Sequence, residues 1–214
     1  MDANIERKKF NVILLGEKSV GKTCLVQSLT GQPFDEHQIA TIGIDNVIRN
    51  VIIKGKKYGF KIFDTAGQER YNCISSSILK AADGFLLVFS VDKKKTLEKI
   101  SKWVDNIENN VDRNEKVLIL VGNKIDINRR EVTNEEGMNF ANERNMKYFE
   151  TSAKTGVGIK EAFNQIFQDI YELDEKIKAN QQKENVNQND NQRNENFEVN
   201  KKNNNEKKKR SKCC

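Results

Sequence analysis

The chain has little of the chemistry that builds membrane spans or metal centres. Its 214 residues contain no apolar run as long as a membrane span, and we expect no N-terminal signal peptide. Histidine occurs once, as His37, in a polar stretch without an evident catalytic partner. The four cysteines lack metal-site spacing, and nothing about them requires an oxidising compartment. The sequence therefore does not favour a membrane-spanning, zinc-binding or disulfide-stabilised protein.

Excess positive charge is also scarce, except near the end of the chain. Of the formal net charge of +6, residues 174–214 carry +4, from 11 Lys/Arg and 7 Asp/Glu, which leaves +2 for residues 1–173. A nearly neutral domain does not indicate a nucleic-acid-binding surface. From residue 174 onward Asn, Gln, Lys and Glu dominate. We therefore expect a folded domain over 1–173 and a disordered tail over 174–214.

Short apolar runs alternate with helical patterns along residues 1–173, which predicts an α/β domain with a six-stranded, mostly parallel sheet. The predicted strands are Phe10–Leu15, Ile44–Ile53, Tyr58–Phe63, Phe85–Val91, Val117–Val121 and Tyr148–Phe149. The second and third should form a hairpin through residues 54–57. One helical stripe consists of Leu97, Ile100, Trp103, Val104 and Ile107, and another of Ala162, Phe163, Ile166, Phe167 and Ile170. We expect Trp103 to be a core residue.

Residues 16–23 read GEKSVGKT, which fits the phosphate-binding P-loop between a strand and a helix. Backbone N–H groups and a helix N-terminus would face the phosphates. Lys22 would neutralise phosphate charge, and the Thr23 hydroxyl would bind Mg²⁺. The candidate phosphate-binding residues are Gly16, Glu17, Lys18, Ser19, Val20, Gly21, Lys22, Thr23 and Cys24. By itself this motif indicates a nucleoside triphosphate, and ATPases, kinases and GTPases remain open.

Two later motifs indicate guanine. Asp126, in the segment Asn123-Lys124-Ile125-Asp126, can accept two N–H bonds from guanine but would be left unpaired against adenine. Asn123 can bond the base edge and neighbouring loops, and the Lys124 stem can cover the ring. In the segment 151–154 the backbone N–H of Ala153 can approach the guanine oxygen. We therefore predict base binding by Asn123, Lys124, Asp126, Ser152, Ala153 and Lys154.

Two polar segments carry residues suited to the γ-phosphate and its metal. Asp64 would hold Mg²⁺ through water, and Thr41 would supply a second hydroxyl to it. Gly67 would offer its N–H to the γ-phosphate, and Gln68 would orient the attacking water as the catalytic residue. Loops that contact only this phosphate and its metal can switch between ordered and disordered states when it leaves.

With GEKSVGKT, TIGID, DTAGQER, NKID and ETSAK in this order, residues 8–173 resemble a small GTPase of the Ras superfamily. The TIGID segment, the 100/103/107 stripe and the terminal Cys213-Cys214 resemble the Rab branch. The resemblance implies a P-loop domain with helices on both sheet faces, and Phe34 at the guanine edge. It also implies GTP hydrolysis and a role in vesicle trafficking. The implied partners are effectors at the switch loops, an exchange factor, a GTPase-activating protein and prenyl-carrier proteins.

The sequence departs from the family at several positions. Lys18 stands where Rab proteins usually have a small residue, and it could crowd Gln68 and slow GTP hydrolysis, or it could point to solvent. Asn46 and Phe63 replace the usual Phe and Trp of the effector-binding patch. Three alternatives therefore stay open: a hydrolysis-impaired, GTP-bound membrane scaffold, a Ras-type signalling GTPase, and an ATP-using enzyme, which Asp126 disfavours.

The end of the chain resembles a Rab prenylation signal. Cys213 and Cys214 are the candidate lipidation sites, and Lys207, Lys208, Lys209, Arg210 and Lys212 precede them. Basic residues near an anionic leaflet and two prenyl chains together supply stable anchoring. A solvated charged end with free thiols and a basic patch for nuclear import or nucleic acid are the other interpretations. We expect the protein at the cytoplasmic face of an intracellular membrane, with a soluble cytosolic pool.

Overall fold

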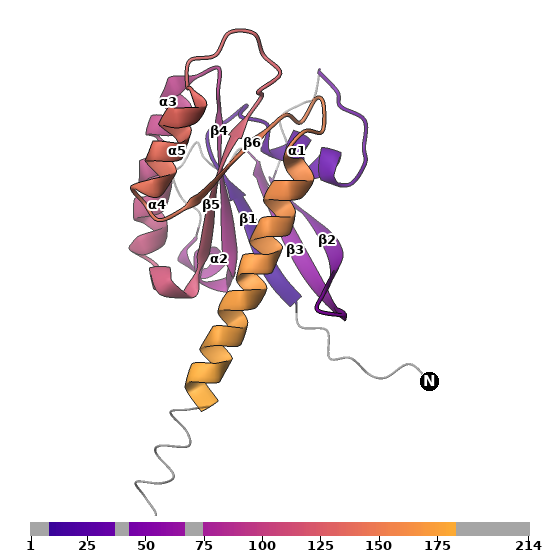
Figure 1. Cartoon of the computed structure of the whole chain (residues 1–214), viewed down its shortest axis with the longest axis vertical. Helices are drawn as coiled ribbons and strands as arrows, with labels where there is room; N and C mark the ends of the chain where they lie inside the picture. The colour runs from indigo at the N-terminus through magenta and orange to yellow at the C-terminus, as the bar shows by residue number, and fades with distance from the viewer. Residues whose placement is uncertain (1–8, 37–42, 67–74, 183–214) are drawn as a thin grey trace, which may run out of the picture. The chain divides into compact units, whose positions relative to one another are not determined.

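The computed structural model describes residues 9–36, 43–66 and 75–182. The chain divides into two compact units, Met1–Leu173 and Asp174–Cys214. The first unit contains a β-sheet and the helices that pack on it (Figure 1).

In the part of the chain that the structure describes, six strands form one sheet in the order β2-β3-β1-β4-β5-β6 (Figure 1). The strands are β1 (Lys9–Leu15), β2 (Gly43–Ile53), β3 (Lys56–Ala66), β4 (Gly84–Ser90), β5 (Val117–Asn123) and β6 (Lys147–Thr151). Strand β2 runs antiparallel to β3, and the other pairs are parallel. This confirms the predicted sheet. The carboxyl ends of β1, β3, β4, β5 and β6 share one edge, where open α/β sheets bind ligands.

The hairpin between β2 and β3 has a shorter turn than the sequence predicted. Lys54 and Gly55 have φ values of 48° and 77°, and a two-residue turn with both φ values positive matches the strand twist. Lys56 and Lys57 belong to β3, where they pair with Ile53 and Ile52. The predicted four-residue connection is therefore wrong in length, although the hairpin itself is confirmed.

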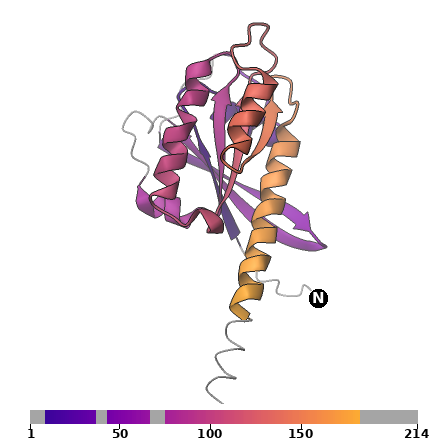
Figure 2. The same ribbon diagram turned by 60° about the vertical axis from the view of Figure 1, so that its left-hand side comes forward.

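Helices cover both faces of the sheet, as predicted. They are α1 (Lys22–Leu29), α2 (Ser76–Ala81), α3 (Lys94–Glu98), α4 (Ile100–Glu108), α5 (Asn134–Asn142), a short 3₁₀ helix at Arg113–Glu115, and the helical residues 159–173. Apolar side chains of α1 and residues 159–173 form one core, and those of α2 to α5 form a second. Figures 1 and 2 show α3, α4 and α5 on one side of the sheet, opposite the orange helix.

Both predicted helical stripes are buried. The stripe from Leu97 to Ile107 lies on two helices, because α3 ends at Glu98 and α4 begins at Ile100, on either side of Lys99. Trp103 is 5% exposed, which confirms it as a core residue. The stripe from Ala162 to Ile170 belongs to the other core.

In the second unit, residues 174–182 are helical, so the disorder predicted from residue 174 is wrong for these nine positions. Lys178 pairs with Asp174 at 2.8 Å and with Glu175 at 3.1 Å, spacings that stabilise a helix. Composition indicates that the tail cannot bury a core, but it does not reveal local ion pairs such as those of Lys178. Within the described ranges, no helix is both long and apolar enough to cross a bilayer.

Candidate functional site

The P-loop connects β1 to α1 and passes close to two other strands. A Cβ added at Gly16 would lie 2.0 Å from the backbone oxygen of Val88 in β4. A Cβ added at Gly21 would lie 2.4 Å from Nδ2 of Asn123 in β5, and Gly21 has a φ of 97°. Neither position has room for a side chain, so these glycines let the loop follow the carboxyl edge of the sheet.

The start of α1 carries positive charge from the Lys22 ammonium and from the helix N-terminus. Lys22 is 6% exposed, and its Nζ donates to the carbonyl oxygens of Gly16 at 2.7 Å and Glu17 at 3.1 Å. The N-cap residue Gly21 offers no side-chain cap, and the first turn carries no acidic residue. The helix N-terminus and a buried lysine therefore face the same loop, which is the arrangement that binds phosphate.

Thr23 and Asp64 bring two oxygen donors together beside this loop. The Thr23 hydroxyl donates to Oδ2 of Asp64 at 2.5 Å, and Asp64 is 3% exposed. Asp64 lies on β3, beside Leu14 of β1. Hydroxyl and carboxylate oxygens suit Mg²⁺, so the donor set fits the predicted metal. The described segments contain no group of three His, Cys, Asp or Glu able to hold a metal ion.

Asn123 links the P-loop to the loop after β6. Its side chain is 1% exposed, and its Nδ2 donates to the Val20 carbonyl at 2.8 Å. Its Oδ1 accepts from the Thr151 hydroxyl and from the Ala153 N–H, both at 3.2 Å. Of the two roles predicted for Asn123, the structure displays the contacts to neighbouring loops. The amide thus fixes the distance between the phosphate-binding loop and the predicted base-binding loops.

Asp126 is positioned by the loop after β6. Ser152, which is fully buried, donates its hydroxyl to Oδ1 of Asp126 at 2.5 Å and accepts from the Thr155 N–H at 3.0 Å. Lys124 has a φ of 70°, and this left-handed residue turns the chain out of β5. Asp126 is exposed beyond this turn, so its carboxylate is held in place and accessible to a ligand.

Strand β6 is fixed just before the predicted base-binding loop. Glu150 forms an ion pair with Arg130 and accepts from the Tyr148 hydroxyl at 2.9 Å. Burial and the hydrogen bond to Glu150 raise the pKa of Tyr148 above its usual value. The phenol therefore stays neutral and remains a donor at physiological pH, which helps to hold Glu150 beside Thr151.

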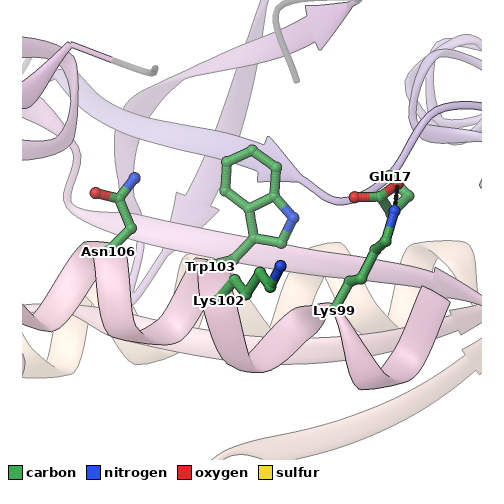
Figure 3. Close-up of a pocket in the computed structure, with 5 residues that line it drawn as sticks. All are labelled: Glu17, Lys99, Lys102, Trp103 and Asn106. Atoms are coloured by element: carbon green, nitrogen blue, oxygen red, sulfur yellow. Dashed lines mark hydrogen bonds and ion pairs between the residues drawn. The ribbon is translucent and has the colours of Figure 1, made fainter. Parts of the chain in front are cut away.

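Two ion pairs join the predicted loops to elements far away in sequence. Glu17 of the P-loop lies 2.6 Å from Lys99, between α3 and α4, and Lys154 lies 2.6 Å from Glu36 in the loop after α1. The first pair lies at the wall of a cavity of about 230 Å³. Figure 3 shows the Glu17 and Lys99 side chains pointing toward each other. The cavity is lined by Glu17, Lys99, Lys102, Trp103 and Asn106. Sequence reasoning missed both pairs, because nothing local indicates partners 82 or 118 residues apart.

The remaining predicted residues differ in exposure. Lys18 and Ser19 are exposed, whereas Val20 is 1% exposed. Cys24 is half-buried, and burial raises the pKa of its thiol. Phe34 is 40% exposed in the loop after α1. The predicted residues Thr41, Gly67, Gln68, Cys213 and Cys214 lie outside the described residues.

The chain is similar to known proteins over most of its length. The model of the Ras family matches residues 11–172. Ras-related protein Rab-18-B of Danio rerio is 36% identical over 181 residues, which cover 85% of this chain and 88% of that protein. Ras-related protein Rab-13 of Canis lupus familiaris is 38% identical over 162 residues, which cover 75% of this chain and 79% of that protein. The chain therefore belongs to the Ras family of small GTPases, in its Rab branch.

Proposed function

We propose that this chain binds GTP and GDP with Mg²⁺, hydrolyses GTP, and acts as a membrane-anchored switch in vesicle trafficking. The observation that carries the proposal is the buried Asn123 amide, which joins Val20 of the P-loop to Ala153. A phosphate subsite and a base subsite held at a fixed separation by one side chain suit a single nucleotide. Asp126, beside Ser152, supplies the carboxylate that favours guanine over adenine.

Each part of the nucleotide would have its own group of residues. Lys22 and the N–H groups of the loop, including those of Ser19 and Cys24, would bind phosphate oxygens. Thr23, Asp64 and Thr41 would hold Mg²⁺, which neutralises phosphate charge when bound. The Gly67 N–H would contact the γ-phosphate, and Gln68 would orient the attacking water. Asp126 would accept hydrogen bonds from the N–H groups of the base. Lys124, Lys154 and Phe34 would cover the faces and edge of the base.

The tail would deliver this domain to a membrane. We propose that Cys213 and Cys214 carry prenyl groups and that the basic residues before them bind anionic lipid at the cytoplasmic face. Two weak signals acting together give stable yet reversible anchoring, which allows a soluble pool bound to a prenyl-carrier protein. Effectors, an exchange factor and a GTPase-activating protein would act through the switch loops. Mass spectrometry of native protein tests this part, and unmodified Cys213 and Cys214 would remove it.

Lys18 decides between a cycling switch and a GTP-bound scaffold. Its side chain is exposed, so its ammonium can remain in solvent, and this favours the cycling switch. The test is single-turnover GTP hydrolysis by the full chain, beside Lys18→Gly. We expect similar rates for the two proteins. A parent rate far below that of Lys18→Gly would instead support the scaffold, held in its GTP form by its own P-loop.

A further inference from the structure

The loop that follows α1 is joined to the predicted base-binding loop by one ion pair. Lys154 Nζ lies 2.6 Å from Oε1 of Glu36, although 118 residues separate them. The Lys154 side chain is 52% exposed and that of Glu36 is 64% exposed. The hydrogen bond that Lys154 donates to the Glu36 carboxylate raises the pKa of Lys154. Phe34 lies two residues before Glu36 in the same loop.

The other described loops of the site are joined by buried contacts. Val20 of the P-loop is bonded to Asn123, Asn123 to Ala153, and Asp126 to Ser152. Each of these bonds has at least one partner that is 1% exposed or less. The pair of Glu36 and Lys154 is the exposed link of this set. It is therefore the contact that water and salt reach most easily.

We propose that Glu36 and Lys154 form a clasp that keeps the Phe34 loop on the base-binding loop and slows nucleotide release. The inference rests on the proposed guanine-nucleotide site. Glu36 is a positioning residue, which acts on the base through Lys154 and through Phe34. When the pair opens, the loop with Phe34 loses its attachment to residue 154, and one side of the base becomes accessible to water.

The Glu36–Lys154 clasp is weak because both of its side chains are exposed. An exposed ion pair contributes little, so we expect its loss to accelerate release about two- to five-fold rather than by orders of magnitude. Salt screens the attraction between exposed charges, because the Debye length shortens from about 10 Å at 0.1 M salt to about 3 Å at 1 M. Nucleotide release should therefore become faster as the salt concentration rises. Nucleotide release from this chain would then be set partly by an ion pair that a charged exchange partner can compete for.

The test is the dissociation of a fluorescent GDP analogue from the full chain, chased with excess GDP at 0.05 M and 1 M NaCl. Glu36→Gln should release the analogue about two- to five-fold faster at low salt, with an unchanged association rate. Salt should accelerate release from the parent more than from Glu36→Gln. In a Lys154→Gln background, Glu36→Gln should have no further effect. Glu161→Gln, an exposed neutralisation just beyond this loop, is the matched control and should leave the rate unchanged.

The outcomes separate the clasp from the function on which it rests. If the parent binds the analogue and Glu36→Gln releases it at the parental rate, the clasp is overturned and the nucleotide site stands. An additive effect of the two substitutions would also overturn the clasp. If the parent binds no guanine nucleotide, the proposed function fails, and the clasp with it. A Glu36→Gln effect on thermal unfolding alone, with unchanged release, would reduce the pair to a structural contact.

Discussion

Replacement of Asn123 by Ala tests the side chain that joins the two halves of the site. The substitution removes three hydrogen bonds, to the Val20 carbonyl, the Thr151 hydroxyl and the Ala153 N–H. Each is worth about 0.5–1.5 kcal/mol net, and the buried groups left behind lose their partner, so we expect a loss of about 2–4 kcal/mol in the free energy of unfolding. The affinity for GDP should fall at least about tenfold, because the loops lose their fixed separation.

The assay is urea unfolding of the full chain in a constant excess of GDP, with the GDP affinity measured separately. This separation is needed because bound nucleotide itself adds to the apparent stability. Asn128→Ala, at an exposed position just beyond Asp126, is the control and should change neither quantity. The preference for GTP over ATP should survive in Asn123→Ala, because Asp126 carries it. A loss below about 1 kcal/mol with unchanged affinity would refute the bracing role assigned to Asn123.

Three further predictions concern the P-loop, the carboxylate predicted to bind the base and the first turn of α5. Gly16→Ala would put a Cβ 2.0 Å from the Val88 carbonyl, so we expect loss of nucleotide binding and a markedly lower unfolding temperature. Asp126→Asn should weaken GTP binding and favour a xanthine nucleotide, whose 2-oxo group accepts from the new amide; equal binding of GTP by both proteins would contradict this. Lys94 and the start of α5 lower the pKa of Glu136 from 4.5 to about 2. The stability it contributes is complete above 4.5 and falls as pH drops toward 2, so the difference in urea midpoint between parent and Glu136→Gln should be smaller at pH 3 than at pH 6.

Local patterns were enough to predict the sheet and the P-loop. Each strand or helix buries one face, and the spacing of its apolar residues along a short segment of sequence shows which face that is. Gly16 and Gly21 likewise mark backbone positions that admit no side chain, and the structure displays the close approaches to Val88 and Asn123 behind them. The turn at Lys54 and Gly55 was harder to bound, because lysines suit both a turn and an exposed strand.

Contacts between distant segments could not be predicted in this way. The ion pairs of Glu17 with Lys99 and of Glu36 with Lys154 join charged residues that look like ordinary solvated surface in the sequence. Asn123 was predicted to contact the base edge and neighbouring loops, but its loop partners Val20 and Ala153 depend on where these residues lie in three dimensions. Long-range pairing of polar groups is set by the fold, so the sequence alone does not predict which charged residues will pair.

The most direct test of the nucleotide site is the content of the purified protein. Full-length protein, prepared in Mg²⁺ without added nucleotide, is denatured, and the released nucleotides are separated and quantified by anion-exchange chromatography. We expect close to one guanine nucleotide per chain and no adenine nucleotide, with much less in Asp126→Ala. Protein that is folded but carries no nucleotide, or carries adenine nucleotide, would contradict a guanine-nucleotide switch.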